Sequence, residues 1–591
     1  MLGKNTPSLL RQLIQYVGAA GLSALQESRY FFTACFVRCC VSLFILKGCP
    51  MRSAITLCLT LVGCATVLLA QSVRVGGSVG SSADIYRAYG NPARLPSETY
   101  RTVAQVNVVL FDQIDLPFEL YLNSGQIGYQ QPFNQFGVTP RIGQWLQLFG
   151  GWYSTRLSDY TFGDLRILGG GVELSPGNFR LAFHYGYTRQ ARNPDSALAF
   201  WGEYRRRIVL GKLGYESADG SFVTLQAMAS QDEPGTIRRD SLTPAPQANA
   251  VVSLAAGSSM FGGAVRLRGE VAAGLFTNNT AAGLDSALTA NIPSLLQQIV
   301  PTNATSNLDG AARLNLTIAP STTWGLMLDG QWIGPGFVTL GYAQLLNDVL
   351  DLTASPYVRI LDGKLSFRAS VGRRTNNLRQ TRIATIERWT ANAGVNWQLS
   401  DAVGVDLQLG QYTMQSNHAN DTLRADNVTQ TVTLTPTWQW SSGSTSHFIS
   451  ATLTYQRTRD NNIISGRYGN NSMLSATLAH TVQLPSKLGL SSSLSYNRTE
   501  TALQNISFAT LNESVTYPFA ERFTLRGTAG LNMTSTTSST FQLLLRAALS
   551  YSLEQWGTLT LQVMNNTYDL TAQQGNRYSE LFGSLQYAVS F

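Results

Sequence analysis

The second half of the chain alternates apolar and polar side chains with a period of two residues. In the runs 428–440, 523–533 and 541–553, Val, Leu, Phe, Trp and Tyr recur at every second position, and Thr, Ser, Gln, Asn and Arg fill most of the others. A period of two is the repeat of a β-strand, whose successive side chains point to opposite faces. The pattern predicts many strands, each with one apolar face and one polar face.

The composition of the polar face indicates the kind of sheet. A soluble sandwich would expose Lys and Glu, whereas this face carries mainly uncharged Thr, Ser, Gln and Asn. Charged residues make up 13% of the chain, about half of the ~25% in a typical soluble domain. An apolar outside around a polar interior is typical of a barrel in lipid, which must close because open edges leave backbone groups unpaired. We predict an all-β, transmembrane, antiparallel up-and-down β-barrel.

The last eleven residues form one alternating strand that ends on an aromatic side chain. It resembles the closing strand of bacterial outer-membrane barrels, in which a C-terminal aromatic strand is the signal read by the barrel-assembly machinery. The resemblance implies the outer membrane of a Gram-negative bacterium as the location, and the assembly machinery and outer-membrane lipid as partners. The residues that would form the signal are Leu585, Tyr587, Val589 and Phe591.

Short and long connections separate the expected strands. Tight turns rich in Pro, Gly, Asp and Asn are expected at 175–178, 361–364, 399–402 and 484–487. Longer polar loops are expected at 190–204, 232–247, 274–308, 414–427, 458–471 and 566–576. Counting back from Phe591 gives about 24 strands, with a range of 22 to 26, beginning near Val103.

The N-terminal region has the features of a processed segment. Residues 51–70 combine a basic start, an apolar core and a final Ala70, which predicts a signal peptide. Residues 1–50 are interpreted as an extension from a start codon assigned too early, and residues 71–102 as a short periplasmic lead to a barrel at 103–591. The alternative for the signal is a lipoprotein box with lipidation at Cys64.

Charge and cysteine usage fit this interpretation. All six cysteines lie within residues 35–64, so the expected mature chain has none that could cross-link in an oxidising compartment. Residues 1–70 hold six basic residues and one acidic residue, so their removal lowers the net charge from +8 to +3 (37 basic against 34 acidic). A charge of this size gives no reason to expect nucleic acid as a partner.

Several turn and loop motifs are similar to those of a group of large, plugless outer-membrane barrels from Bacteroidota and relatives. The motifs are Gln131–Pro140, Gly170–Gly177 and the stretch from Gly334-Pro335-Gly336 to Gly341. The resemblance implies fold and location over most of residues 100–591. It implies no substrate, because that group carries no settled one.

Residues that could support chemistry are few. The chain has four histidines, of which His184 is expected to face inward beside Arg180 and His480 to lie on the apolar face, so no histidine cluster is expected. The triple glycine at 169–171 lacks the Lys-Ser/Thr of a phosphate-binding loop. We expect no catalytic residues, no cofactor and no metal site, and therefore no enzyme.

Strand alternation assigns an inward-facing set of charges. The basic members are Arg180, Arg266, Arg268, Arg313, Arg368, Arg526 and Arg546. The acidic members are Glu173, Glu270, Asp329 and Asp406. A basic excess in a lumen attracts anions. The alternative is that these arginines pair with lumen acids and brace the wall.

Loop 283–300 differs from the rest because its apolar residues recur at spacings of three and four, which is a helical pattern. Its apolar face is expected to pack into the barrel mouth or against a protein partner. Two functions remain open for the whole chain. One is a pore for small solutes with mild anion preference. The other is a surface receptor, or the membrane component of an envelope export or assembly complex, with a filled lumen.

Overall fold

The computed structural model describes residues 73–90, 93–124, 135–196, 199–283, 294–536, 539–569 and 578–591. The chain divides into two units, Met1–Val73 and Arg74–Phe591, and the second contains the fold discussed below. The expected extension at 1–50, signal peptide at 51–70 and lipidation site at Cys64 lie outside the described residues, so these expectations stay predictions.

The described chain is built almost entirely of strands. They are β1 (Val73–Tyr89), β2 (Glu98–Leu110), β3 (Ile114–Asn123), β4 (Gln135–Val138), β5 (Arg141–Ile142), β6 (Leu146–Ser154), β7 (Arg166–Leu174), β8 (Phe179–Arg189), β9 (Arg205–Glu216), β10 (Phe222–Glu233), β11 (Ala248–Met260), β12 (Val265–Thr277), β13 (Ser306–Ile318), β14 (Trp324–Ile333), β15 (Val349–Ile360), β16 (Leu365–Asn376), β17 (Ile386–Gln398), β18 (Val403–Ser416), β19 (Asp426–Ser442), β20 (Thr445–Asp460), β21 (Asn471–Gln483), β22 (Gly489–Thr501), β23 (Asn505–Ala520), β24 (Phe523–Ser535), β25 (Ser539–Ser552), β26 (Thr558–Asp569) and β27 (Tyr578–Ser590). The described helices are short: α5 (Ser294–Ile299), α6 (Gly466–Gly469) and the 3-10 turns η1 (Pro234–Thr236), η2 (Phe261–Gly263), η3 (Asp421–Leu423) and η4 (Glu554–Trp556). Among the described residues, no helix is long and apolar enough to cross a membrane.

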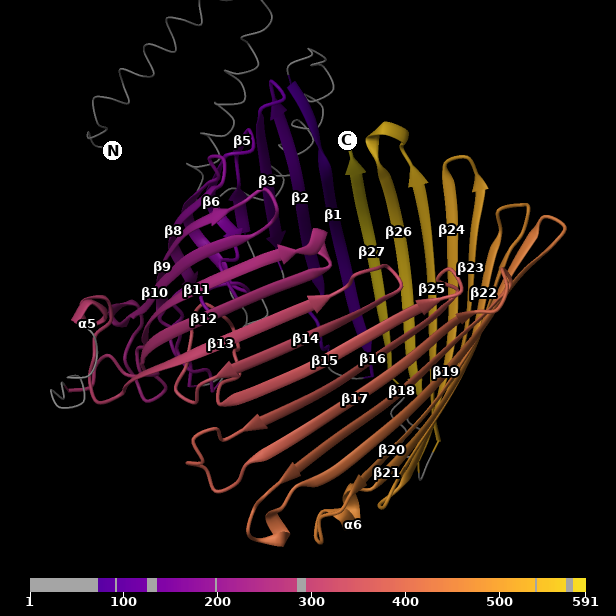
Figure 1. Cartoon of the computed structure of the whole chain (residues 1–591). Helices are drawn as coiled ribbons and strands as arrows, with labels where there is room; N and C mark the ends of the chain where they lie inside the picture. The colour runs from indigo at the N-terminus through magenta and orange to yellow at the C-terminus, as the bar shows by residue number, and fades with distance from the viewer. Residues whose placement is uncertain are drawn as a thin grey trace, which may run out of the picture. The chain divides into compact units, whose positions relative to one another are not determined.

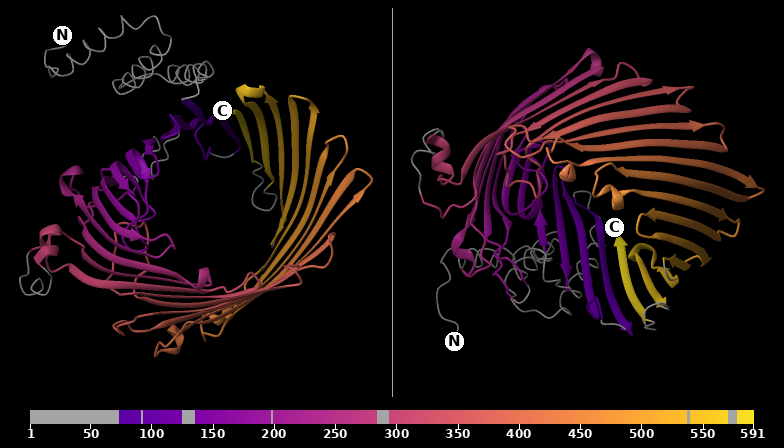
Figure 2. Two further views of the ribbon diagram at one scale, coloured as in Figure 1. Left: turned by 45° about the horizontal axis from the view of Figure 1, so that its top comes forward. Right: turned by 90° about the horizontal axis from the view of Figure 1, so that it is seen from below.

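The strands form one closed antiparallel barrel. Neighbouring strands along the chain pair with each other, and β27 pairs with β1 from Ser78 opposite Ser590 to Tyr89 opposite Ser579. The indigo and yellow ends of the sheet accordingly lie side by side in Figure 1, and the strands form a ring in Figure 2. Because β4 and β5 share one position between β3 and β6, the 27 described strands occupy 26 positions. The expected fold class is confirmed, at the upper end of the expected range.

The barrel begins earlier than the sequence pattern indicated. The expected periplasmic lead at 71–102 instead contains all of β1 and the start of β2. The early part of β1 is rich in Gly and Ser, so it shows almost no apolar alternation. Its backbone still supplies the hydrogen-bonding groups that the edge of β27 needs, because a barrel in lipid cannot leave an edge unpaired. The expected boundary near Val103 was therefore wrong.

The two ends of the barrel differ in their connections. At one end, which we call the short-turn end, the strands are joined by two to five residues, as between β11 and β12 or between β15 and β16. At the other, the long-loop end, most connections are longer, and the one between β12 and β13 is the longest. The expected tight turns all lie at the short-turn end, and the expected long loops all lie at the long-loop end.

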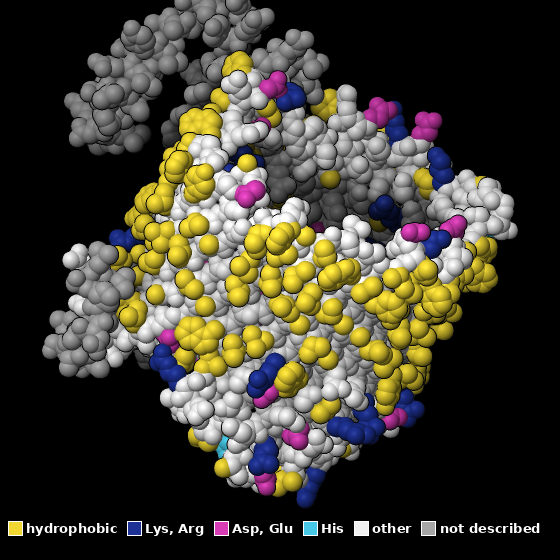
Figure 3. Space-filling model, viewed as in Figure 1, with side chains coloured by type: hydrophobic (Ala, Val, Ile, Leu, Met, Phe, Trp, Pro, Cys, Tyr) yellow, Lys and Arg dark blue, Asp and Glu magenta, His cyan; other side chains and the backbone are white. Residues whose placement is uncertain are grey.

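The outer face of the barrel is apolar. Outward side chains such as Leu314, Leu494 and Leu561 are 55%, 54% and 52% exposed. In the space-filling view, apolar side chains form a belt across the face that is shown, and charged side chains gather on either side of it (Figure 3). This is the lipid-facing band expected of a membrane barrel.

Two connections from the long-loop end fold into the barrel instead of extending from it. Inner loop 1 (residues 155–165) joins β6 to β7, and inner loop 2 (residues 334–348) joins β14 to β15. Tyr160 and Phe162 of inner loop 1 and Phe337 of inner loop 2 have almost no exposed surface. They pack with inward residues of the wall, including Ile208 and Val251. One sector of the lumen wall is therefore covered by a hydrophobic core.

The expected helical loop ends on the outer wall. α5 lies outside the ring of strands (Figures 1 and 2), and Val300, which follows it, is 2% exposed. Val300 packs on Ala248, Ala250 and Leu275. In β11, Ala248 and Ala250 share the outward face with the exposed Leu254. Residues 284–293 lie outside the described residues. The described end of this segment therefore packs on the barrel wall and not in its mouth.

Candidate functional site

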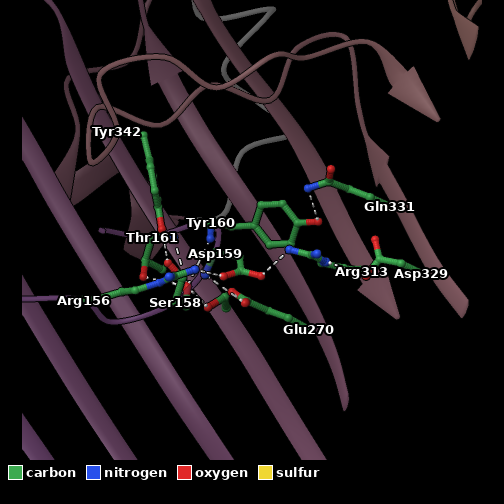
Figure 4. A network of polar contacts seen from close by, with 11 residues as sticks. Arg156, Ser158, Asp159, Tyr160, Thr161, Glu270, Arg313, Asp329, Gln331 and Tyr342 are labelled. Carbon is green, nitrogen blue, oxygen red and sulfur yellow. Dashed lines mark hydrogen bonds and ion pairs between the residues drawn. The ribbon is translucent and has the colours of Figure 1, made fainter. Parts of the chain in front are cut away.

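Inner loop 1 places a polar network on the lumen wall (Figure 4). The Asp159 carboxylate accepts from the Arg313 guanidinium of β13 at 2.9 Å, and the same guanidinium contacts Asp329 of β14 at 3.1 Å. The backbone N–H of Asp159 donates to Glu270 of β12 at 3.2 Å. Arg156 completes the chain through a 2.5 Å ion pair with Asp159. The loop thus presents alternating charges along the inner surface of β12 to β14.

Inner loops 1 and 2 are also joined by hydrogen bonds. The Thr339 hydroxyl donates to the carbonyl oxygen of Thr161 at 3.1 Å, and the Tyr342 hydroxyl donates to the carbonyl oxygen of Ser158. The side chain of Asn249 on β11 donates to the Val338 carbonyl at 2.9 Å. Because buried polar groups need such partners, the two loops and the wall form one hydrogen-bonded unit.

Asp309 of β13 anchors inner loop 2. Its buried carboxylate accepts from the backbone N–H of Gly336 at 2.8 Å and from the Arg379 guanidinium, also at 2.8 Å. A Cβ at Gly334 would collide with this carboxylate, and one at Gly336 would collide with Asn307. The Gly-Pro-Gly motif found in the sequence is therefore the site at which inner loop 2 passes close to β13.

Two tyrosines of the inner loops stay neutral. Burial raises the pKa of Tyr160 to about 12, and burial likewise raises the pKa of Tyr342 to about 12. Each hydroxyl takes part in a hydrogen bond: Tyr160 accepts from Gln331 at 3.2 Å, and Tyr342 donates to Ser158. At ordinary pH both rings therefore serve as uncharged hydrogen-bonding groups that position the loops.

All eleven charges assigned to the lumen from the sequence occupy inward positions of their strands, but their surroundings differ. One group has polar partners. Arg180 pairs with Glu216 at 3.1 Å, Arg313 with Asp159 and Asp329, and Arg546 with Gln562 at 2.5 Å; Glu173 accepts from Thr155 at 2.9 Å, Glu270 from the Asp159 backbone, and Asp406 from Gln408 at 2.8 Å. These residues are therefore paired in the way expected of side chains that brace the wall.

The second group has no polar partner among the described residues. Arg266, Arg268, Arg368 and Arg526 have no hydrogen bond or ion pair to any described residue. Arg266, Arg268 and Arg368 are exposed to the lumen. Arg359, which sequence reasoning missed, joins them: it is exposed on an inward position of β15, and its guanidinium lies 5.3 Å from the ring of Tyr357. The alternation of β15 could have identified it.

The lumen wall from β19 to β22 carries little charge. From β19 to β22 the inward positions are mainly Thr, Ser, Asn and Gln, and many hydroxyls pair across strands, as do Thr433 with Thr454 at 3.0 Å and Thr477 with Ser495 at 3.1 Å. The lumen therefore has a charged side, near the inner loops, and an uncharged, hydroxyl-rich side.

The histidines are arranged differently from the expectation. His184 is fully buried and faces inward, with its Nε2 3.3 Å from the Glu173 carboxylate. His447 and His480 meet on the outward face, 3.3 Å apart, and stack with Trp440. The expectation of no histidine cluster was wrong for this pair, because the register that joins β19, β20 and β21 cannot be derived from alternation alone. Among the described residues, no group of three or more His, Cys, Asp and Glu side chains could hold a metal ion.

Comparison with known proteins gives no sequence relative: no family model matches the chain, and no curated protein does. Solved structures match at low similarity. The P pilus usher (PapC) translocation pore matches with 10% identity over 88% of this chain and 99% of that one, at a TM-score of 0.26. OccAB2 from Acinetobacter baumannii matches with 13% identity over 59% and 93%, at 0.27. The siderophore receptor PirA from Pseudomonas aeruginosa matches with 10% identity over 87% and 80%, at 0.37. These values are too low to carry an inference about this chain.

Proposed function

We propose that the protein is an outer-membrane pore for small solutes with a mild preference for anions. The observation that carries the proposal is the lumen: a closed barrel of 26 strand positions surrounds a space whose mouth is hollow, with Lys or Arg side chains inside it (Figure 3). Polar inward positions on β19 to β22 provide a wettable wall. The free arginines give this space its basic excess, which raises the local concentration of anions.

The inner loops define where such a pore narrows. They cover the inner face of one sector and leave the hydroxyl-rich wall opposite them uncovered. A charged strip lies on the loop-covered side of the narrow part of the pore, and it consists of Arg156, Asp159, Arg313 and Asp329. Solutes would pass between this strip and the hydroxyl-rich wall, where the fixed charges act on them most strongly.

The apolar belt supports a membrane location, and the closing strand supports delivery by the barrel-assembly machinery of a Gram-negative bacterium. Leu585 is exposed on the outward face, whereas Val589 is 2% exposed because it packs with Val79 and Ala104. Phe591 pairs its backbone N–H and C=O with Gly77. The proposed assembly signal is therefore also part of the seam that closes the barrel. We also propose that the chain belongs with the large barrels of Bacteroidota that its motifs resemble.

The second candidate is a receptor or a component of an export or assembly complex. The hydrogen-bonded inner loops favour it, because they already fill part of the lumen. A protein partner would bind near α5, where Ile299 is 47% exposed on the outside.

Reversal potentials in a potassium chloride gradient across a planar bilayer test the proposal. We expect anion preference that weakens at high salt, because screening shortens to about 3 Å at 1 M. Arg526→Gln should reduce the preference, whereas Arg459→Gln, which removes an exposed charge from the outward face of β20, should not. Clear cation selectivity would contradict the anion assignment. Absence of conductance in folded protein would contradict the pore and leave the receptor or complex.

A further inference from the structure

Paired and free inward arginines occupy different parts of the lumen. Toward the long-loop end, inward arginines contact acids: Arg206 lies 2.7 Å from Asp232, and Arg374 pairs with Asp351. Toward the short-turn end of β12 to β16, the four arginines at 266, 268, 359 and 368 have no acidic partner among the described residues. At the same end of the barrel Arg180 lies 3.1 Å from Glu216, so the lack of an acidic partner is a property of these four arginines and not of the short-turn end as a whole.

Apart from Glu270, which follows Arg268 on the inward face of β12 and accepts from the Asp159 backbone N–H at 3.2 Å, the inward positions next to these four arginines on β12 to β16 contain no carboxylate. On β13 they are Asn315 and Thr317, and on the short-turn half of β14 to β16 they are Gly325, Met327, Ser355, Tyr357, Ser366 and Ser370. The next carboxylate along β14 is Asp329, which is already engaged by Arg313 and by Asn315 at 3.2 Å. Glu270 is therefore the one carboxylate of the adjoining wall positions that has no arginine partner, and it leaves most of the positive charge of the four arginines uncompensated.

We propose that Arg266, Arg268, Arg359 and Arg368 form a binding site for extended polyanions at the short-turn mouth of the lumen. This proposal rests on the proposed function, since it names the solute class that the anion-preferring pore would select. Guanidinium groups bind phosphate and carboxylate oxygens in bidentate geometry, and each of the four is exposed to take such a ligand.

The spacing of the arginines selects the shape of the ligand. Arg266 and Arg268 lie two residues apart on one face of β12, about 7 Å along the strand. Arg368 stands opposite Tyr357, two residues from Arg359, so these two arginines form a second pair. Four strand steps of about 4.8 Å separate β12 from β16, which places the two pairs about 20 Å apart along the wall. A single phosphate reaches one pair, whereas a linear polyanion can contact both.

Isothermal titration of the detergent-purified barrel with long-chain inorganic polyphosphate, which can span both pairs, and with orthophosphate as the short probe, measures this site without requiring ion flow. We expect polyphosphate to bind at least about tenfold more tightly than orthophosphate, and more weakly as salt rises. R266Q/R268Q and R359Q/R368Q should each reduce the affinity by about tenfold or more. Heat-modifiable migration on gels verifies that each variant is folded, and either double variant suffices if the other fails to fold.

The matched control is R457Q/R459Q. These two arginines are also two residues apart on one strand and exposed, but they face outward from β20, so their removal should leave the affinity for polyphosphate unchanged. The proposed site would be overturned by an equal loss of affinity in the control variant, by equal affinities for the two probes, or by no binding to the folded barrel. A barrel that binds polyphosphate but does not conduct would overturn the proposed pore and keep the binding site. A barrel that conducts but does not bind polyphosphate would overturn the site and keep the pore.

Discussion

Replacing Asp309 with Asn should release inner loop 2 from the barrel wall. The carboxylate accepts from the Gly336 and Gly310 backbone N–H groups and from Arg379. An Asn side chain has one acceptor oxygen and presents an N–H group to one set of these donors. A hydrogen bond to a charged group contributes about 1.5–3 kcal/mol. The Arg379 side chain is 56% exposed, so its ion pair adds only about 1 kcal/mol.

The expected loss in the stability of the closed inner loop 2 is therefore about 2–4 kcal/mol. Because each 1.4 kcal/mol is a factor of ten, the open population should rise about 30- to 700-fold. The assay is the alkylation rate of a single cysteine at Leu340→Cys. Leu340 is 8% exposed, and the chain has no native cysteine beyond residue 64. When opening is fast relative to alkylation, the rate follows the open population.

The control is Asp219→Asn, which removes an exposed aspartate from the short turn between β9 and β10. The alkylation rate at position 340 should stay within about threefold of the rate in the Leu340→Cys protein that keeps Asp219, as expected for a change outside any packed feature. An unchanged rate in the folded Asp309→Asn variant would refute the reasoning, because it would show that the anchor does not hold inner loop 2.

Three further predictions concern assembly, the seam and processing. Deletion of Phe591 should lower the amount of heat-modifiable barrel without changing secretion, because it removes the backbone pair with Gly77. Phe591→Asp should have the same effect, because it replaces the exposed aromatic side chain of the proposed assembly signal with a charge; wild-type amounts of folded protein would contradict this. Glu580→Gln should lower the free energy of unfolding, measured by urea titration, by about 2 kcal/mol or more, because this buried carboxylate accepts from Tyr86 at 2.7 Å and from Arg94 at 2.5 Å. Glu554→Gln, at an exposed ion pair, should lower it by about 1 kcal/mol or less. Mass spectrometry of outer-membrane protein should find a first residue close to Gln71; peptides from residues 1–50 would contradict the signal-peptide interpretation, and a lipid on Cys64 would favour the lipoprotein alternative.

The strands with strong alternation could be predicted well from the sequence. In β25, Phe541, Leu543 and Leu545 lie outside, and the inward positions between and after them are Gln542, Leu544 and Arg546. The prediction succeeds because the two-residue period is a local property of an extended backbone. The same argument fails for β1, whose Gly and Ser side chains carry no pattern although its backbone closes the barrel.

The lumen could be predicted only in part. Alternation places Arg266 and Arg313 on the same face of the wall, but it cannot show that Arg313 is engaged by Asp159 from a loop more than 150 positions earlier in the chain. The apolar residues of inner loop 1, such as Tyr160 and Phe162, gave no sign in the sequence that they would fold inward and bury themselves against the wall. A loop leaves no periodic signal for where it packs.

By itself, the sequence determined the repeating unit of this protein: strands with an apolar outward face and a polar inward face, joined by short turns at one end and long loops at the other. These follow from side-chain alternation and turn chemistry, which act within a few residues of one another. Only the tertiary structure decided which strand closes the ring, which loops enter the lumen and which arginines find a partner. Those outcomes depend on register and on contacts between distant segments, since a wall position acquires its neighbours only when the whole barrel has formed.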